Sequence, residues 1–112
     1  MEKLELYKKL SLEDKSNLTA YCVYDSIYAA ASNAEKCIED NEVERIYELS
    51  NYLYLKDEYY NFSVQKIADF IAIGFLEKNV PLEIMEKTSK DDMFYAIDND
   101  NYEILLEDKI ER

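Results

Sequence analysis

The run from Ile67 to Leu76 contains one polar residue, Asp69, and constrains the fold more than any other part of the chain. Its apolar residues fall on nearly every side of a helix, so a helix here must be enclosed by its neighbours. About ten helical residues span roughly 15 Å, which is half the thickness of a bilayer core. The run therefore predicts the central helix of a small soluble domain, over residues 63–79, and no membrane contact.

The composition favours an all-α fold. The chain has 112 residues, enough for one hydrophobic core, so we expect residues 1–112 to form a single domain. It contains one glycine and one proline, whereas an all-β domain would need several glycines in its turns. We predict a mainly helical, compact bundle of about 5–7 helices around the central apolar helix 63–79.

Amphipathic patterns predict three helices before the central one. A short helix is expected over residues 1–10. A long helix should follow a capping box that begins at Ser11 and should end near Ile38. A third helix should follow a capping box that begins at Asn41 and should reach about Tyr60.

The C-terminal part allows two interpretations. Pro81 is well placed to begin a short helix, and Ser89 and Asp100 could each cap another. Alternating apolar residues also permit a short C-terminal β-hairpin over residues 93–106, and we favour the helices. Within the central helix, Gly74 lowers helix propensity and is expected to mark a close helix crossing.

Residues 63–97 also have the succession of a helix-turn-helix. In a DNA-binding protein the last helix would present Arg, Lys, Asn or Gln to the bases. Here that segment is Lys90–Asp98 and is rich in aspartate. Together with a formal net charge of −12, this argues against direct binding to nucleic acid or to an anionic membrane.

Residues for catalysis or metal binding are scarce. The chain has no histidine, no G-x-S-x-G motif and no glycine-rich phosphate loop, so we expect no enzyme activity, no cofactor and no metal. The segment Asp98–Asn101 resembles the start of an EF-hand loop, but Glu103 and Lys109 stand where glycine and glutamate are required. Asp69 is expected to face solvent or to accept a hydrogen bond from a tyrosine.

The two cysteines are expected to be reduced. Cys22 and Cys37 lie 15 residues apart on the predicted long helix, which would separate them by roughly 22 Å. A disulfide requires Cα atoms within about 7 Å of each other. Free thiols indicate a cytoplasmic protein.

Nearly all the negative charge lies in two blocks. Residues 37–62 have seven acidic and two basic side chains, and residues 81–112 have ten acidic and four basic. The intervening segment 63–80 has no net charge. An acidic surface of this kind favours basic partners, including proteins that themselves bind nucleic acid.

Tyrosine is the most unusual component, with eleven residues in a chain that lacks tryptophan. Some must line the core, but helical spacing also produces aromatic stripes outside it. Tyrosine is enriched at interface hot spots because it combines a large contact area with a polar tip. The stripes are formed by Tyr21, Tyr24 and Tyr28, and by Tyr52 and Tyr59.

These features predict a non-enzymatic acidic protein-interaction module. The expected function is inhibition of a basic nucleic-acid-binding protein or nuclease, as by the anti-CRISPR and DNA-mimic proteins of phages. One alternative is an immunity protein or antitoxin that neutralises a cognate toxin, and another is a homodimerising structural or regulatory module. The predicted partner-binding residues are Glu39, Asp40, Glu42, Glu44, Tyr47, Tyr54, Asp57, Glu58, Asp91, Asp92, Asp98 and Asp100.

Overall fold

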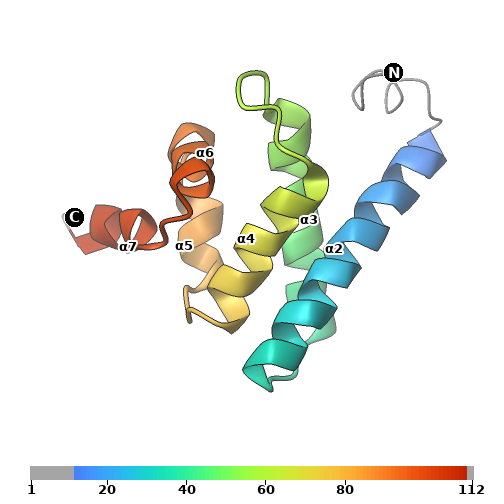
Figure 1. Cartoon of the computed structure of the whole chain (residues 1–112), viewed down its shortest axis with the longest axis horizontal. Coiled ribbons are helices and arrows are strands. Elements are labelled where there is room, and N and C mark those ends of the chain that lie inside the picture. Colours follow the sequence, from blue (N-terminus) through green and yellow to red (C-terminus); the bar gives the residue numbers. More distant parts are fainter. Residues whose placement is uncertain (1–11, 111–112) are drawn as a thin grey trace.

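The computed structural model describes residues 12–110, and it describes side chains over residues 21–106. Within residues 12–110 the chain forms six helices and no strand, which confirms the predicted all-α bundle (Figure 1). The helix predicted over residues 1–10 lies outside the described part. The helices are α2 (Leu12–Ala34), α3 (Asp40–Lys56), α4 (Val64–Leu76), α5 (Leu82–Lys87), α6 (Lys90–Asn99) and α7 (Glu103–Ile110).

Helix α4 is the predicted central helix, and it packs against both α2 and α3. Its hydrophobic residues are buried on several sides, because α2 and α3 cover it from one direction and the C-terminal helices from the other (Figure 1). Ser63 caps its first turn, with the side-chain Oγ accepting a hydrogen bond from the amide of Lys66 at 3.0 Å. No helix among residues 12–110 has both the length and the apolarity needed to cross a bilayer.

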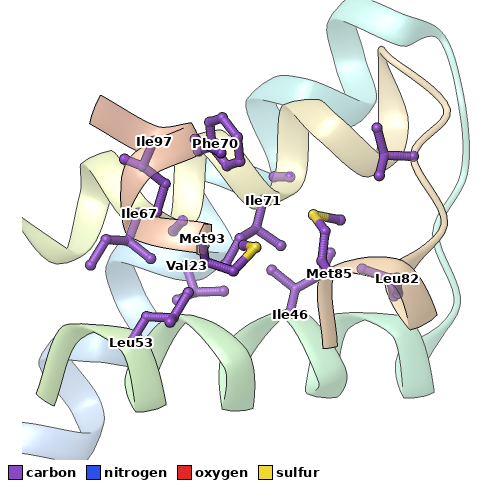
Figure 2. Packing of buried hydrophobic residues seen from close by; sticks show 14 of the residues in the cluster. Val23, Ile46, Leu53, Ile67, Phe70, Ile71, Leu82, Met85, Met93 and Ile97 are labelled. Carbon is purple, nitrogen blue, oxygen red and sulfur yellow. The ribbon is translucent and has the colours of Figure 1, made fainter. Parts of the chain in front are cut away.

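The core is continuous through the six helices α2 to α7, and Figure 2 shows part of it. Side chains from α2 and α3 meet those of α4, and methionines from α5 and α6 fill the space beside them. Burying large aliphatic side chains of this kind stabilises a fold by roughly 1.5–3 kcal/mol each. The residues at its centre include Val23, Ile46, Leu53, Ile67, Ile71, Met85 and Met93.

Three helices end in left-handed residues that are not glycine. Glu35 after α2, Asn79 after α4 and Asp100 after α6 have φ values of 55°, 60° and 49°. Each closes its helix with a backbone bond from the next amide, as in the 3.0 Å bond from Lys36 N to Ala31 O. The chain thus forms helix ends that usually rely on glycine without using one there.

Replacing Glu35 with glycine is expected to raise the free energy of unfolding by about 1 kcal/mol. Glycine adopts positive φ without the Cβ clash that a non-glycine residue suffers in this region. Chemical denaturation of the two proteins measures the difference. Glu35→Ala is the control and should bring no gain, because alanine keeps the Cβ atom. An equal gain in both variants would assign the effect to the lost carboxylate instead.

Helix α3 differs from the predicted helix at both ends. Its N-cap is Glu39, two residues before Asn41, and the backbone amide of Glu39 donates to the Glu42 carboxylate at 3.0 Å. It ends at Lys56 rather than near Tyr60, because the side chain of Asp57 captures the next backbone amides. Helix α2 likewise ends at Ala34, four residues before the predicted boundary.

The alternative β-hairpin over residues 93–106 is wrong. This stretch forms most of α6 and the beginning of α7. The buried residues of α6 are Met93, Phe94, Ala96 and Ile97, which recur with the period of a helix rather than every second residue. The predicted cap at Ser89 is present, since its Oγ accepts a hydrogen bond from the amide of Asp92 at 3.2 Å.

Gly74 marks a close approach, but by an aromatic ring and not by a crossing helix. A Cβ atom at this position would lie 2.7 Å from Cε1 of Tyr102, which precedes α7. The Tyr102 ring stacks on Phe70 with centroids 4.2 Å apart, and its hydroxyl donates to the Phe70 carbonyl at 2.9 Å. Burial raises the pKa of Tyr102 and keeps that donor protonated. The Tyr102 ring therefore fixes the C-terminal part of the chain to α4.

Candidate functional site

The acidic block at residues 37–62 does not form one surface. Residues Glu39 to Glu44 begin α3, whereas Asp57 and Glu58 follow its last residue (Figure 1). A helix of 17 residues separates its two ends by roughly 25 Å. The two parts of the block therefore face different surroundings.

The acidic residues at the start of α3 share their surface with the chain's own cations. Glu42 lines a shallow pocket together with Lys36, and its carboxylate also accepts the helix-capping bond. Arg45 pairs with Glu86 of α5, with Nε 3.1 Å from Oε2. This hydrogen bond raises the pKa of Arg45 and lowers that of Glu86. Of the predicted residues here, Glu39, Asp40 and Glu44 are exposed.

Asp57 has a structural role at the end of α3. Its Oδ1 accepts hydrogen bonds from the amides of Tyr60 and Asn61 at 2.8 and 3.1 Å, and its Oδ2 accepts one from Phe62 at 2.6 Å. Three backbone donors thus use both oxygens of this carboxylate. The neighbouring Glu58 is exposed.

The loop that Asp57 organises lies beside α6. Within it, the ring of Tyr60 stacks on Phe62 with centroids 4.9 Å apart and an interplanar angle of 9°. The same ring lies 5.9 Å from that of Phe94 in α6, and Tyr59 meets it edge-on at 5.0 Å. Partial burial raises the pKa of Tyr60, and the nearby carboxylates of α6 add to the effect. Two regions about thirty residues apart in the sequence are therefore brought together.

The solvent-facing side of α6 completes this site. Asp91, Tyr95 and Asp98 are spaced by four and three residues, so they share one helical face. Tyr95 is 54% exposed and Tyr59 is 87% exposed. We call the set Tyr59, Tyr60, Asp91, Tyr95 and Asp98 the acidic–aromatic surface. It combines exposed rings with carboxylates on a rigid support.

A groove of about 550 Å³ adjoins this surface and shares Asp98 with it. It lies between α4 and the segment that joins α6 to α7. Its walls are partly apolar, and three carboxylates open into it, accompanied by the ammonium group of Lys66. The lining residues are Ser63, Gln65, Lys66, Asp69, Phe70, Ile73, Ile97, Asp98, Asp100 and Tyr102.

The other predicted residues are dispersed. Tyr47 and Tyr54 are half-buried and pack against the core. Asp92 is exposed in the first turn of α6, and Asp100 is the left-handed residue that closes this helix. Asp69, which was expected to face solvent or to accept a hydrogen bond from a tyrosine, is half-buried and lines the groove.

Sequence reasoning missed part of this site. Tyr95 lies between Asp91 and Asp98 at helical spacing, a signal that was present in the sequence. Tyr59 and Tyr60 join the site because the loop after α3 folds against α6, whereas Lys66 reaches the groove from α4. No local pattern indicates that contact.

Reactive groups are few in the part of the chain that the structure describes. No cluster of three or more acidic or cysteine side chains in this part is arranged to hold a metal ion. Both cysteines are free thiols. Burial raises the pKa of the Cys22 thiol, with a further contribution from Asp25 and Asp69, and a protonated thiol is a poor nucleophile.

Comparison of the chain with protein-family models, curated proteins and solved structures finds no match.

Proposed function

We propose that this protein is a non-enzymatic interaction module that inhibits a basic nucleic-acid-binding protein, such as a nuclease, in the manner of phage anti-CRISPR or DNA-mimic proteins. The acidic–aromatic surface and its adjoining groove form the contact. The observation that carries the proposal is the face of α6, on which Asp91 and Asp98 flank the exposed ring of Tyr95.

The carboxylates of this site remain available to a cationic partner. Two ion pairs occur among the side chains of residues 21–106, and neither involves Asp69, Asp98 or Asp100. The pair of Lys90 with Asp91 is 3.8 Å long and exposed, so it contributes little and is easily exchanged. Negative potential from such groups accelerates association with a basic protein.

The aromatic rings supply the part of the binding energy that charge does not. Exposed tyrosines that become desolvated at the centre of an interface slow dissociation. Tyr60 is held by its stack on Phe62 and Tyr95 by a helix, so both side chains lose little entropy on binding.

The groove suits a lysine or arginine side chain of the partner. Phe70, Ile73 and Ile97 can contact the aliphatic stem, while Asp98 and Asp100 accept hydrogen bonds from the charged head. The same acidic groups exclude phosphate, so α6 cannot read DNA although it follows α4 and α5 in the order of a helix-turn-helix.

Titration with an arginine-rich peptide, followed by amide NMR shifts, tests the location of the contact. We expect the largest changes near residues 59–60 and 91–100. Asp91→Lys with Asp98→Lys should weaken binding at least about tenfold, equivalent to about 1.4 kcal/mol. Glu44→Lys with Glu48→Lys is the matched control, because it makes the same change in net charge on exposed positions of α3. A greater loss in that control would place the contact on α3 and contradict the proposal.

Affinity capture with the whole protein as bait extends the test to natural partners. A basic protein should be captured at about 50 mM salt and largely lost at about 500 mM, because screening weakens contacts between exposed charges. Capture that persists in the Asp91→Lys, Asp98→Lys variant would contradict the assignment of this surface.

A further inference from the structure

A second exposed aromatic patch lies on α2, on the side turned away from α4. Tyr21, Tyr24 and Tyr28 are 73%, 55% and 80% exposed, and their spacing of three and four residues places them on one face. The opposite face of α2 contributes Val23 and Ile27 to the core. The three rings, here called the α2 tyrosine stripe, therefore lie outside the core that the described residues form.

We propose that the α2 tyrosine stripe binds the same stripe of a second copy of this chain. The two helices would pack antiparallel about a two-fold axis near Tyr24, with Tyr21 of each copy opposite Tyr28 of the other. Such an isologous contact uses one patch twice and closes at two subunits. The inference does not depend on the proposed function, because it concerns a different surface.

The near-absence of charge supports a second copy, and not a strongly basic protein, as the occupant. From Tyr21 to Ala34 the helix has one charged side chain, Asp25, whose Oδ2 accepts a hydrogen bond from Gln65 at 3.0 Å. The acidic blocks that hold most of the net charge of −12 lie outside this helix. Electrostatic repulsion between two such molecules is strong when their acidic faces approach and weakest when they approach through the stripe. A strongly basic protein would instead find almost no carboxylates there.

The area of the stripe predicts a weak dimer. Together, the exposed area of the three side chains equals that of about two whole tyrosine side chains. Full burial would remove roughly 400 Å² per subunit, or roughly 800 Å² in the pair. This is below the roughly 1,200 Å² of the smallest stable interfaces. The small exposed residues Ala29 and Ser32 lie beside the rings and permit close approach of the facing helix. A dissociation constant in the micromolar range is expected.

Sedimentation velocity of the whole protein, from about 1 to about 300 μM, tests the proposal. The wild-type protein should change from monomer to dimer over this range, and Tyr24→Ala with Tyr28→Ala should remain monomeric. Tyr59→Ala with Tyr95→Ala removes two exposed tyrosines elsewhere and should dimerise as the wild type does. A monomeric wild type, or loss of the dimer in both variants, would overturn the proposal.

Two further measurements do not depend on loss of binding. Asp25→Asn should tighten the dimer by a factor of several, because the two Asp25 carboxylates approach each other near the axis. Raising the salt concentration should also tighten it by screening the repulsion between two acidic molecules. The contact with a basic partner responds to salt in the opposite direction, so the two proposals can fail separately. No change with Asp25→Asn and weakening by salt would each contradict the α2 dimer.

Discussion

Replacing Tyr102 with alanine is expected to lower the free energy of unfolding by about 3 kcal/mol, as for other large-to-small changes of packed aromatic residues. The substitution removes the ring that stacks on Phe70 and fills the space above Gly74. Chemical denaturation monitored by circular dichroism gives the value. Tyr102→Phe is the control and should cost about 1 kcal/mol, because it removes only the hydrogen bond to the Phe70 carbonyl.

Gly74→Ala tests the same contact, because the substitution should change stability in opposite directions with and without the Tyr102 ring. In the wild-type background the new methyl group would meet the Tyr102 ring, so the variant should lose about 1–3 kcal/mol. In the Tyr102→Ala background the space is open, and alanine should add up to about 1 kcal/mol through its higher helix propensity. An identical effect in both backgrounds would show that the ring does not occupy the space beside Gly74.

Asp57→Ala is expected to lower the free energy of unfolding by about 2 kcal/mol, because three backbone amides lose a charged acceptor. Denaturation again measures the loss. The stability of Asp57→Asn should lie between those of the wild type and Asp57→Ala. Glu58→Ala is the matched control, since that neighbouring side chain is exposed and its loss should change stability by less than about 0.5 kcal/mol. Equal, small effects at both positions would contradict the role of Asp57 in organising the loop.

The central part of the fold could be predicted because it depends on local pattern. The apolar run from Ile67 to Leu76 can only be an enclosed helix at this chain length, and it is one. The cap at Ser89 was also predictable, since a side chain binds an amide three residues later. The tail allowed two interpretations because its apolar residues fit both periods over so short a segment. The segment is helical, and it is held against α4 by the contact of Tyr102 with Phe70, two residues far apart in the sequence.

The candidate site was predicted only in part, for a similar reason. Sequence marks where carboxylates are numerous, but it does not distinguish one bound to backbone amides from one that faces solvent. Asp57 is of the first kind and Asp98 of the second. The packing of Tyr60 against Phe94, which joins the loop to α6, follows from tertiary structure alone.

The position of Tyr102 has a consequence for how the protein matures on the ribosome. Helices α2, α3 and α4 leave the exit tunnel first, yet the Phe70 ring and the backbone at Gly74 stay uncovered until Tyr102 emerges. Chains released early, before this residue, would expose an apolar strip of α4 and be prone to aggregation. A chain cut before Tyr102 is therefore expected to be less stable than the full sequence, because part of the apolar surface of α4 stays uncovered.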